Sequence, residues 1–312
     1  GFYASLSGDY YVEAAAYGDS ATGAYTLSAA DVTSQFASAD AIADQLVNGY
    51  WTNQGVEAHR FNVTSGGSLT YNVVALTAEG QTLARAALST WTEMTGVSFV
   101  ETTGTASITF DDSQPGAYSN SSWSGAFISS STVNISTDWL TSYGASFNSY
   151  GFQTYIHEIG HALGLGHAGD YNGSAAYPTD ALFVNDSWQA SIMSYFDPLA
   201  NTMVDGAYAY LVSPMLADII AIQSMYGSAS CVRAGATTYG FHANAGDFYN
   251  AALYPDVQYT IYDVGGVDTL DFSGFSQSQA LDLRAESRSS VGALRGNVGI
   301  ARGVVIENAI GG

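Results

Sequence analysis

Residues 157–167 read HEIGHALGLGH and place three of the chain's five histidines within eleven residues. The flanking segment 152–163 fits a helix, and side chains four residues apart on a helix project from one face. His157 and His161 therefore point the same way, while Glu158 lies about 100° further around the helix and near the same site. Gly164 can adopt a left-handed conformation and end the helix. The chain then turns back, so that His167 can reach the same point from outside the helix.

This spacing predicts a metal centre. Three neutral imidazoles that converge leave a fourth coordination position open, which is typical of a catalytic zinc site and not of a closed structural one. A bare HExxH also occurs by chance as two ordinary helix histidines, whereas the full HExxHxxGxxH pattern is much more specific. We therefore expect one catalytic Zn²⁺, with His157, His161 and His167 as its ligands.

Composition limits the class of protein. The 312 residues are 47% apolar, which is enough for one large folded domain or two ordinary ones. The net charge is −21 and all seven cations are Arg, so the chain does not have the basic clusters of a nucleic-acid binder. The sequence contains no run of 18 or more apolar residues, so no membrane-spanning helix is predicted.

The cysteine and acid content bears on where the protein works. The lone Cys231 excludes an internal disulfide, which is compatible with secretion if calcium takes over the stabilising role. Many of the aspartates stand beside glycine, a pairing that suits hard cations, although most acids are also accounted for by a solvated acidic surface. The chain begins at Gly1 and not at Met, which is consistent with removal of a signal or pro-segment.

Local patterns predict a layered arrangement of helices and strands. Residues 1–36 alternate apolar and polar side chains around turn signals and are predicted to form a β-hairpin appendage. A helix is expected over 77–94, capped by Thr77 and ended by Gly96. Strands are expected around it at 69–74, 97–101, 106–110 and 132–136. Because helix and strands interleave, an α/β layer arrangement is favoured.

The character of the chain changes near residue 229. A further helix is expected to start at Ser213-Pro214 and to end before Gly227. Beyond it, no long helical pattern remains, and short strands at 259–263, 269–272 and 304–307 alternate with Gly/Asp turns. We therefore predict three parts: an appendage at 1–36, a main domain at 37–228 and a β-rich domain at 229–312.

Several motifs together resemble one family. HEIGHALGLGH is similar to the metzincin signature, and four other segments resemble the serralysin branch, the secreted calcium-stabilised bacterial zinc proteases: AGDYN at 168–172, SIMSY at 191–195, PMLADI at 214–219 and GVVIENAIGG at 303–312. The resemblance covers roughly residues 37–312. It implies an α+β fold, with a metzincin-type catalytic domain of mixed twisted sheet and long helices. A calcium-binding β-rich domain of β-roll or β-sandwich type would follow, as the start of a truncated RTX-like region.

The same resemblance assigns roles at the metal centre. Glu158 acts as general base and then as general acid during peptide hydrolysis. Met193 packs under the metal as a floor and is not a ligand. Tyr195 ligates zinc in the resting enzyme, swings away when substrate binds and then stabilises the oxyanion. A peptide substrate would add to an edge strand, for which the Ser-rich segment 126–135 is the best candidate.

The resemblance also implies about two structural Ca²⁺ ions. Residues 263–271 resemble the edge of a calcium-binding nonapeptide repeat, and glycine turns with Asp oxygens suit this ion. One ion would use Arg233, Gly235, Thr237, Asp263, Gly265 and Asp268; the other would use Gly266, Asp268, Val305 and Glu307. Because the family has Thr where this chain has Val305, only the backbone carbonyl of Val305 remains as a ligand.

The favoured interpretation is a secreted, extracellular and monomeric zinc endopeptidase that acts on proteins or peptides. Two alternatives stay open: a calcium-stabilised binding or adhesion module with a vestigial site, and a latent fragment whose residues 1–36 cover the cleft. The presence of Glu158 favours an enzyme, since a degenerate site could lose this residue most easily. No charged specificity pocket is evident in the sequence.

Overall fold

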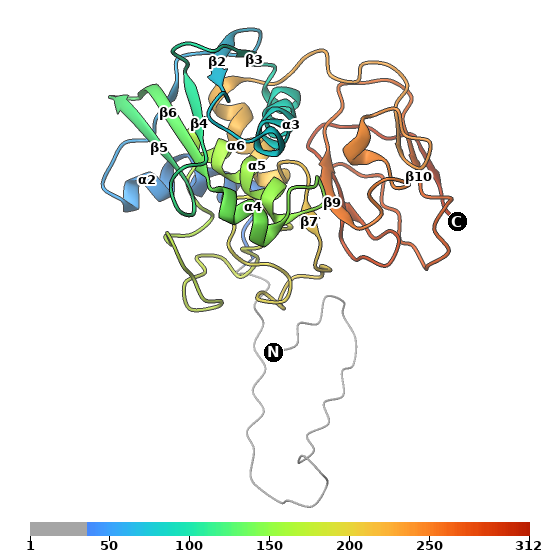
Figure 1. The fold of residues 1–312 in the computed structure, drawn as a ribbon. Helices are drawn as coiled ribbons and strands as arrows, with labels where there is room; N and C mark the ends of the chain where they lie inside the picture. Colours follow the sequence, from blue (N-terminus) through green and yellow to red (C-terminus); the bar gives the residue numbers. More distant parts are fainter. Residues whose placement is uncertain (1–35) are drawn as a thin grey trace, which may run out of the picture.

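The computed structural model describes residues 36–312, and Figure 1 shows their arrangement. The hairpin predicted over 1–36 lies outside the described residues apart from Phe36. None of the described helices is long and apolar enough to cross a membrane.

A mixed sheet forms one layer of the N-terminal half. Its strands are β1 (Arg60–Phe61), β2 (Ser68–Asn72), β3 (Ser98–Glu101), β4 (Ile108–Asp111), β5 (Ala117–Ser124) and β6 (Phe127–Ile135). The order is β1-β6-β4-β2-β3, all parallel, with β5 antiparallel on β6. Strands β2, β3 and β4 correspond to predicted strands, and the strand predicted at 132–136 is the C-terminal part of the longer β6.

The prediction that segment 126–135 forms the edge of the sheet is wrong. This segment is β6, which is hydrogen-bonded on one side to β5 and on the other to β1 and β4. The outer strand is β5, whose sequence AYSNSSWS is as polar and serine-rich as that of β6. Composition could not separate the two strands, because both expose one face to solvent and the difference lies only in their pairing.

Helices form the second layer of this half. Three pack near the metal site: α3 (Ala78–Thr95), α5 (Tyr150–Ala162) and α6 (Leu216–Tyr226). The others are α1 (Ala39–Asp44), the π-helical turn η2 (Gln45–Gly49), α2 (Tyr50–Asn53) and α4 (Thr137–Tyr143). As predicted, the Thr77 hydroxyl caps α3 by accepting from the Gly80 N–H, and Gly96 ends the helix at a φ of +70°.

Helix α6 begins later than its predicted start at Ser213-Pro214. Its N-cap is Met215, whose N–H donates to the Asp218 carboxylate at 2.8 Å. Ser213 does not cap the helix, because its hydroxyl donates to the Pro214 carbonyl and accepts from the Thr260 N–H. Ser213 therefore hydrogen-bonds to the backbone of Thr260 in a neighbouring strand and does not cap the helix.

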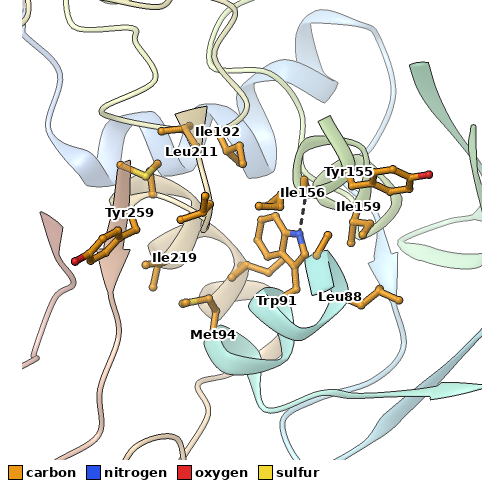
Figure 2. Packing of buried hydrophobic residues seen from close by; sticks show 14 of the residues in the cluster. Leu88, Trp91, Met94, Tyr155, Ile156, Ile159, Ile192, Leu211, Ile219 and Tyr259 are labelled. Carbon is orange, nitrogen blue, oxygen red and sulfur yellow. Dashed lines mark hydrogen bonds between the residues drawn. The ribbon is translucent and has the colours of Figure 1, made fainter. Parts of the chain in front are cut away.

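The three site helices meet around Trp91 of α3, as Figure 2 shows. This side chain is fully buried, and its indole N–H donates to the Ile156 carbonyl of α5 at 3.1 Å. Ile159 of α5 and Ile219 of α6 lie in the same buried cluster. Burial of an aromatic side chain of this size contributes a large share of a core's stability, so α5 is held rigidly where it presents its histidines.

The C-terminal half contains two small sheets of short strands. The first has the order β13-β10-β8, all parallel, and the second has the order β11-β12-β9-β7. Their bounds are β7 (Tyr210–Leu211), β8 (Thr238–Gly240), β9 (Val257–Ile261), β10 (Thr269–Asp271), β11 (Arg288–Ser289), β12 (Val298–Ile300) and β13 (Asn308–Ile310); a short 3₁₀ turn, η3, spans Asp247–Tyr249. Strand β7 precedes α6 and thus lies before the predicted boundary near residue 229, but it pairs with β9, so the segments on the two sides of that boundary share a sheet.

The strand predicted at 304–307 is not formed. Val304 and Ile306 are buried and Val305 is 65% exposed, so the side chains alternate as in a strand. The backbone has no ladder partner there: the Val304 N–H donates to the Ala301 carbonyl within a turn, and the Glu307 N–H donates to the Asp268 carbonyl just before β13 begins. The ladder starts only at Asn308, the first residue of β13.

Candidate metal centre and active site

Helix α5 and the loop after it bring the three predicted ligands together. The Ser149 hydroxyl caps α5, and His157 and His161 lie on it one turn apart. The Nε2 atom of His161 lies 3.1 Å from Nε2 of His157 and 2.9 Å from Nε2 of His167. Among the described residues, these three form the one group of three or more histidine, cysteine or acidic side chains whose ligand atoms all lie within 4.8 Å of one another.

The outer nitrogens determine which ring atoms face each other. His157 Nδ1 lies 2.8 Å from the Ile192 carbonyl, and His161 Nδ1 lies 2.8 Å from the Leu165 carbonyl. A carbonyl only accepts, so both Nδ1 atoms must donate, and in the neutral rings both Nε2 atoms carry lone pairs. Lone pairs this close repel one another unless a cation lies between them. The spacing is close to the roughly 3.3 Å edge of a tetrahedron with zinc–nitrogen bonds of about 2.0–2.1 Å.

Burial keeps these rings neutral. It lowers the pKa of His157 to about 4 and that of His161 to about 3, and the pKa of His167 lies well below its usual range. Desolvation is the main cause in each case, and for His161 and His167 the neighbouring imidazoles add to it. A neutral imidazole is the form that binds a metal, so the three rings are in the ligating state at neutral pH.

Glu158 lies beside the three histidines and has no cation partner in the described part of the chain. Its side chain is 7% exposed, and burial raises its pKa to about 8. A carboxyl group whose pKa lies near neutrality can both take and give a proton, as a general acid–base residue must.

Two glycines in the motif are required by close contacts. At Gly160, a β-carbon would lie 2.7 Å from Met193 Sδ and 3.2 Å from the Trp91 ring. Met193 is fully buried and packs against α5 at Gly160. Gly164 has a φ of +103° and its α-carbon faces the His59 carbonyl, so the turn that returns His167 to the site needs a residue without a side chain.

A buried aspartate holds the segment around Met193. Asp218 of α6 accepts from the Ser191 hydroxyl at 2.6 Å and from the Ile192 N–H at 2.7 Å. The Ser191 hydroxyl in turn accepts from the Met193 N–H, and the Ile192 carbonyl accepts from His157. Hydrogen bonds therefore connect Asp218 to a predicted zinc ligand through one residue, an arrangement that fixes ligand orientation in metal sites.

Tyr195 lies at the edge of the cluster. Its ring centroid is 4.7 Å from that of His167 and 6.1 Å from that of His157, and its hydroxyl accepts from the Gly173 N–H at 3.3 Å. The Tyr171 hydroxyl accepts from the Tyr195 N–H and donates to Asp186, which is fully buried. The backbone at Tyr195 is thus supported from the loop that carries the third ligand.

Sequence reasoning did not identify Asp218 or Asp186. Asp218 stands in the first turn of a helix, where an acid is expected simply because it interacts favourably with the helix dipole. Asp186 lies in a loop without any regular pattern. Only their burial without a cation partner distinguishes them, and burial requires the fold.

The residues predicted to bind calcium gather around Asp268. Asp268 Oδ1 accepts from the Thr237 N–H, the Asp268 N–H donates to Glu307 Oε2 at 2.7 Å, and the Gly266 α-carbon lies against the Gly235 carbonyl. Asp268 Oδ2 is buried and has no hydrogen-bond partner in the described chain. Burial, together with nearby Asp263 and Glu307, raises the pKa of Asp268.

The remaining predicted calcium ligands lie nearby or have other contacts. Asp263 accepts from the Gly265 N–H at 2.9 Å and from the Tyr239 hydroxyl at 2.8 Å. The Arg233 side chain points elsewhere, to Glu93 of α3 at 2.6 Å, which leaves only its backbone carbonyl as a possible ligand. Val305 is likewise restricted to its carbonyl, because its apolar side chain is exposed.

Two family models match the chain. One, described as Met-zincin, matches residues 153–227, and the other, described as Peptidase M10 serralysin C terminal, matches residues 228–312. Together they cover the metal centre and the whole β-rich half.

Curated relatives agree with these matches. A serralysin of Photorhabdus laumondii is 41% identical over 247 residues, which is 73% of this chain and 50% of the relative. Metallopeptidase AprA of Pseudomonas marginalis is 40% identical over 250 residues, or 75% and 52%. Serralysin C of Dickeya chrysanthemi is 40% identical over 257 residues, or 77% and 53%. The chain spans about half the length of these relatives, and the matches to both halves, with the histidine cluster, show that it belongs to the serralysin family of metzincins.

Proposed function

We propose that this chain is a secreted zinc endopeptidase that hydrolyses peptide bonds of proteins. The observation that carries the proposal is the convergence of three histidine Nε2 atoms beside a buried carboxyl group, Glu158. The serralysin and metallopeptidase names of the relatives support the reaction class, and the family resemblance supports placement outside the cell.

His157, His161 and His167 would hold the zinc through Nε2. When bound there, zinc supplies Lewis-acid polarisation of the scissile carbonyl and makes water a nucleophile near neutral pH, by lowering its pKa to about 7. The two carbonyls that accept from Nδ1 of His157 and His161 keep these rings in the ligating tautomer.

Glu158 would act twice on the same proton. As a carboxylate it removes a proton from the attacking water, and as a carboxylic acid it passes this proton to the leaving amide nitrogen. Its buried position excludes bulk water and raises its pKa toward neutrality, so both the carboxylate and the carboxylic acid are accessible. The positive charge of a bound metal favours the carboxylate, which is the form that begins the reaction.

Peptide substrate would bind along β5. In the described chain, β5 pairs only with β6, so its outer N–H and C=O groups are available to an added strand. This replaces segment 126–135 as the expected binding edge. The strand lies against α5, which carries the catalytic residues.

Tyr195 would stabilise the oxyanion through its hydroxyl. Substituting phenylalanine for Tyr195 is expected to leave zinc content unchanged and to lower kcat by roughly 10²–10³-fold, the usual effect of removing one oxyanion donor. Steady-state kinetics on a fluorogenic peptide would measure this, with Tyr177→Phe as a control outside the cluster. An unchanged kcat would exclude the oxyanion role.

Calcium would stabilise the β-rich half. The support for this is Asp268 Oδ2, a buried carboxylate oxygen without a partner, beside Asp263, Glu307 and the Gly235 carbonyl. Because the described acids there are too few for an all-carboxylate site, backbone carbonyls would complete the coordination, as is usual for this ion.

Removing calcium is expected to lower the melting temperature. A ligand at a concentration 100 times its Kd stabilises the native state by about 2.7 kcal/mol, which chelation would remove. Differential scanning calorimetry with chelator, followed by addition of Ca²⁺ alone, measures the shift at constant zinc content. The shift should be smaller in Asp268→Ala, and its absence in the unsubstituted chain would contradict the calcium proposal.

The peptidase proposal is tested by casein hydrolysis with the 312-residue chain. Hydrolysis is expected in the zinc-loaded protein, loss is expected with a zinc chelator, and recovery is expected on adding zinc. A zinc-loaded, folded chain that leaves casein and unstructured peptides intact would refute the proposal.

A further inference from the structure

Trp123 is an exposed tryptophan near the end of the outer strand. Its side chain is 41% exposed, and it is the second-last residue of β5. The rest of this strand is almost entirely small or polar, so the large apolar ring is an exception in it. An exposed Trp is costly in solubility terms and is frequently a binding anchor.

Strand pairing shows which way Trp123 faces. Residues directly opposite each other on paired strands share a face of the sheet. Trp123 is opposite Ile128 and Ser121 is opposite Ser131, with a bulge in between. The Ser131 hydroxyl donates to the Ala162 carbonyl at the end of α5. Trp123 therefore lies on the face of β5 that is turned toward the catalytic helix.

The ring is held rigidly on one side. It stacks on the His59 ring at a centroid distance of 4.2 Å and an interplanar angle of 1°. His59 is 3% exposed and packs in turn on Trp51, with ring centroids 4.4 Å apart. Trp51 donates its indole N–H to the Gly164 carbonyl, between the second and third predicted zinc ligands.

Further ring contacts connect Trp123 to the metal centre. Tyr50, the neighbour of Trp51, packs edge-on against His167 with ring centroids 5.3 Å apart. The rings of Trp123, His59, Trp51 and Tyr50 thus form a continuous series that ends at a predicted zinc ligand. One face of Trp123 is covered by His59, and 41% of the residue stays exposed to solvent.

We propose that Trp123 forms an aromatic subsite of the peptide cleft, which selects substrates with an aromatic side chain upstream of the scissile bond. The inference rests on the proposed peptidase function and names a determinant of its specificity. The recognised group is the flat ring of Phe, Tyr or Trp in the substrate, which packs against the open part of the indole.

The direction follows from the course of β5. The strand starts at Ala117, opposite Ile135 and next to the cap of α4, and reaches the C-terminus of α5 at Ser121, whose partner Ser131 donates to the Ala162 carbonyl; Trp123 lies beyond this point. A peptide added antiparallel to β5 has its N-terminal half at the Trp123 end. The side chain that reaches Trp123 therefore lies on the N-terminal side of the bond held at the histidines.

The physical basis is pre-organisation. Because His59 and Trp51 fix the indole before substrate arrives, a substrate ring stacks on it with little loss of rotamer freedom in the protein. A well-placed aromatic pair is worth roughly three- to tenfold in an equilibrium or rate ratio beyond simple burial.

Peptide pairs test the proposal in the 312-residue chain. Each pair carries Phe or Ala at one position, two to four residues upstream or downstream of the cleaved bond. The unsubstituted chain should prefer Phe at one upstream position by roughly three- to tenfold in kcat/KM. Trp123→Ala should abolish that preference mainly through KM, and Trp123→Phe should retain most of it.

Phe127→Ala is the matched control. Phe127 is 45% exposed and lies close by on β6, but it neighbours the inward-facing Ile128 and so faces the opposite side of the sheet. This variant should keep the Phe preference. An upstream preference that survives in Trp123→Ala, or a Trp123-dependent preference on the downstream side, would overturn the proposal.

Binding separates this proposal from the peptidase proposal. In Glu158→Ala, the same Phe and Ala peptides can be titrated while Trp fluorescence is followed, without any turnover. Tighter binding of the Phe peptide that disappears in Glu158→Ala/Trp123→Ala supports the subsite even if the parent chain cleaves nothing, in which case only the peptidase proposal fails. Equal binding of both peptides refutes the subsite.

Discussion

Glu158→Ala is expected to abolish casein hydrolysis while leaving zinc content and fold intact. The substitution removes the buried carboxyl group beside the three histidines, and general acid–base action alone is worth about 10²–10⁴-fold in rate. Because Glu158 is not a ligand, metal affinity should change little. Removing a carboxyl group that burial already disfavours in its charged form should also not destabilise the protein.

The measurement is kcat/KM on a fluorogenic peptide, with zinc content and circular dichroism on the same samples. Glu79→Ala is the matched control, because Glu79 is an exposed acid in the first turn of α3. That variant should match the parent chain. Hydrolysis by Glu158→Ala at more than about a tenth of the parent rate would show that another group moves the proton, since general acid–base action is worth at least 10².

Asp218→Ala is expected to have the largest effect on stability. The carboxylate accepts from the Ser191 hydroxyl and from the Ile192 and Met215 N–H groups, all of them buried. Its removal leaves these donors unpaired, which costs about 3–5 kcal/mol in the free energy of unfolding. For a chain of this size the melting temperature should fall by roughly 10 °C.

The same substitution should weaken zinc binding, because the Ile192 carbonyl that orients His157 is no longer held. Loss of a partner behind a metal ligand typically costs 10–100-fold in affinity. Asp138→Ala is the control: Asp138 also lies in the first turn of its helix, α4, but is exposed. If Asp218→Ala melts and binds zinc as Asp138→Ala does, the support role assigned to Asp218 is wrong.

The part of the site that could be predicted from sequence is the part coded locally. The spacing of His157, His161 and Gly164 on one helix and its turn fixes geometry within eleven residues, and the structure brings the three histidines together as expected. The helix over 77–94 could also be predicted, because Thr77 and Gly96 are local capping signals.

What could not be predicted depends on pairing between distant segments. Strands β5 and β6 have the same serine-rich composition, and only their neighbours decide which one is the edge. Asp218 acts on the site through its hydrogen bonds to Ser191 and Ile192. Trp123 is held by stacking on His59, which packs in turn on Trp51. Segment 304–307 alternates like a strand, but its backbone pairs with no other strand, and the ladder with β10 begins only at Asn308.

The central claim is that the three histidines form one zinc site that hydrolyses peptide bonds. The most direct measurement is a titration of the metal-free chain with zinc, in which peptide hydrolysis is followed at each step and bound zinc is determined by elemental mass spectrometry. Hydrolysis should rise in proportion to zinc and reach its plateau at one zinc per chain. A plateau of bound zinc without any hydrolysis, or hydrolysis that does not depend on zinc, would contradict the claim.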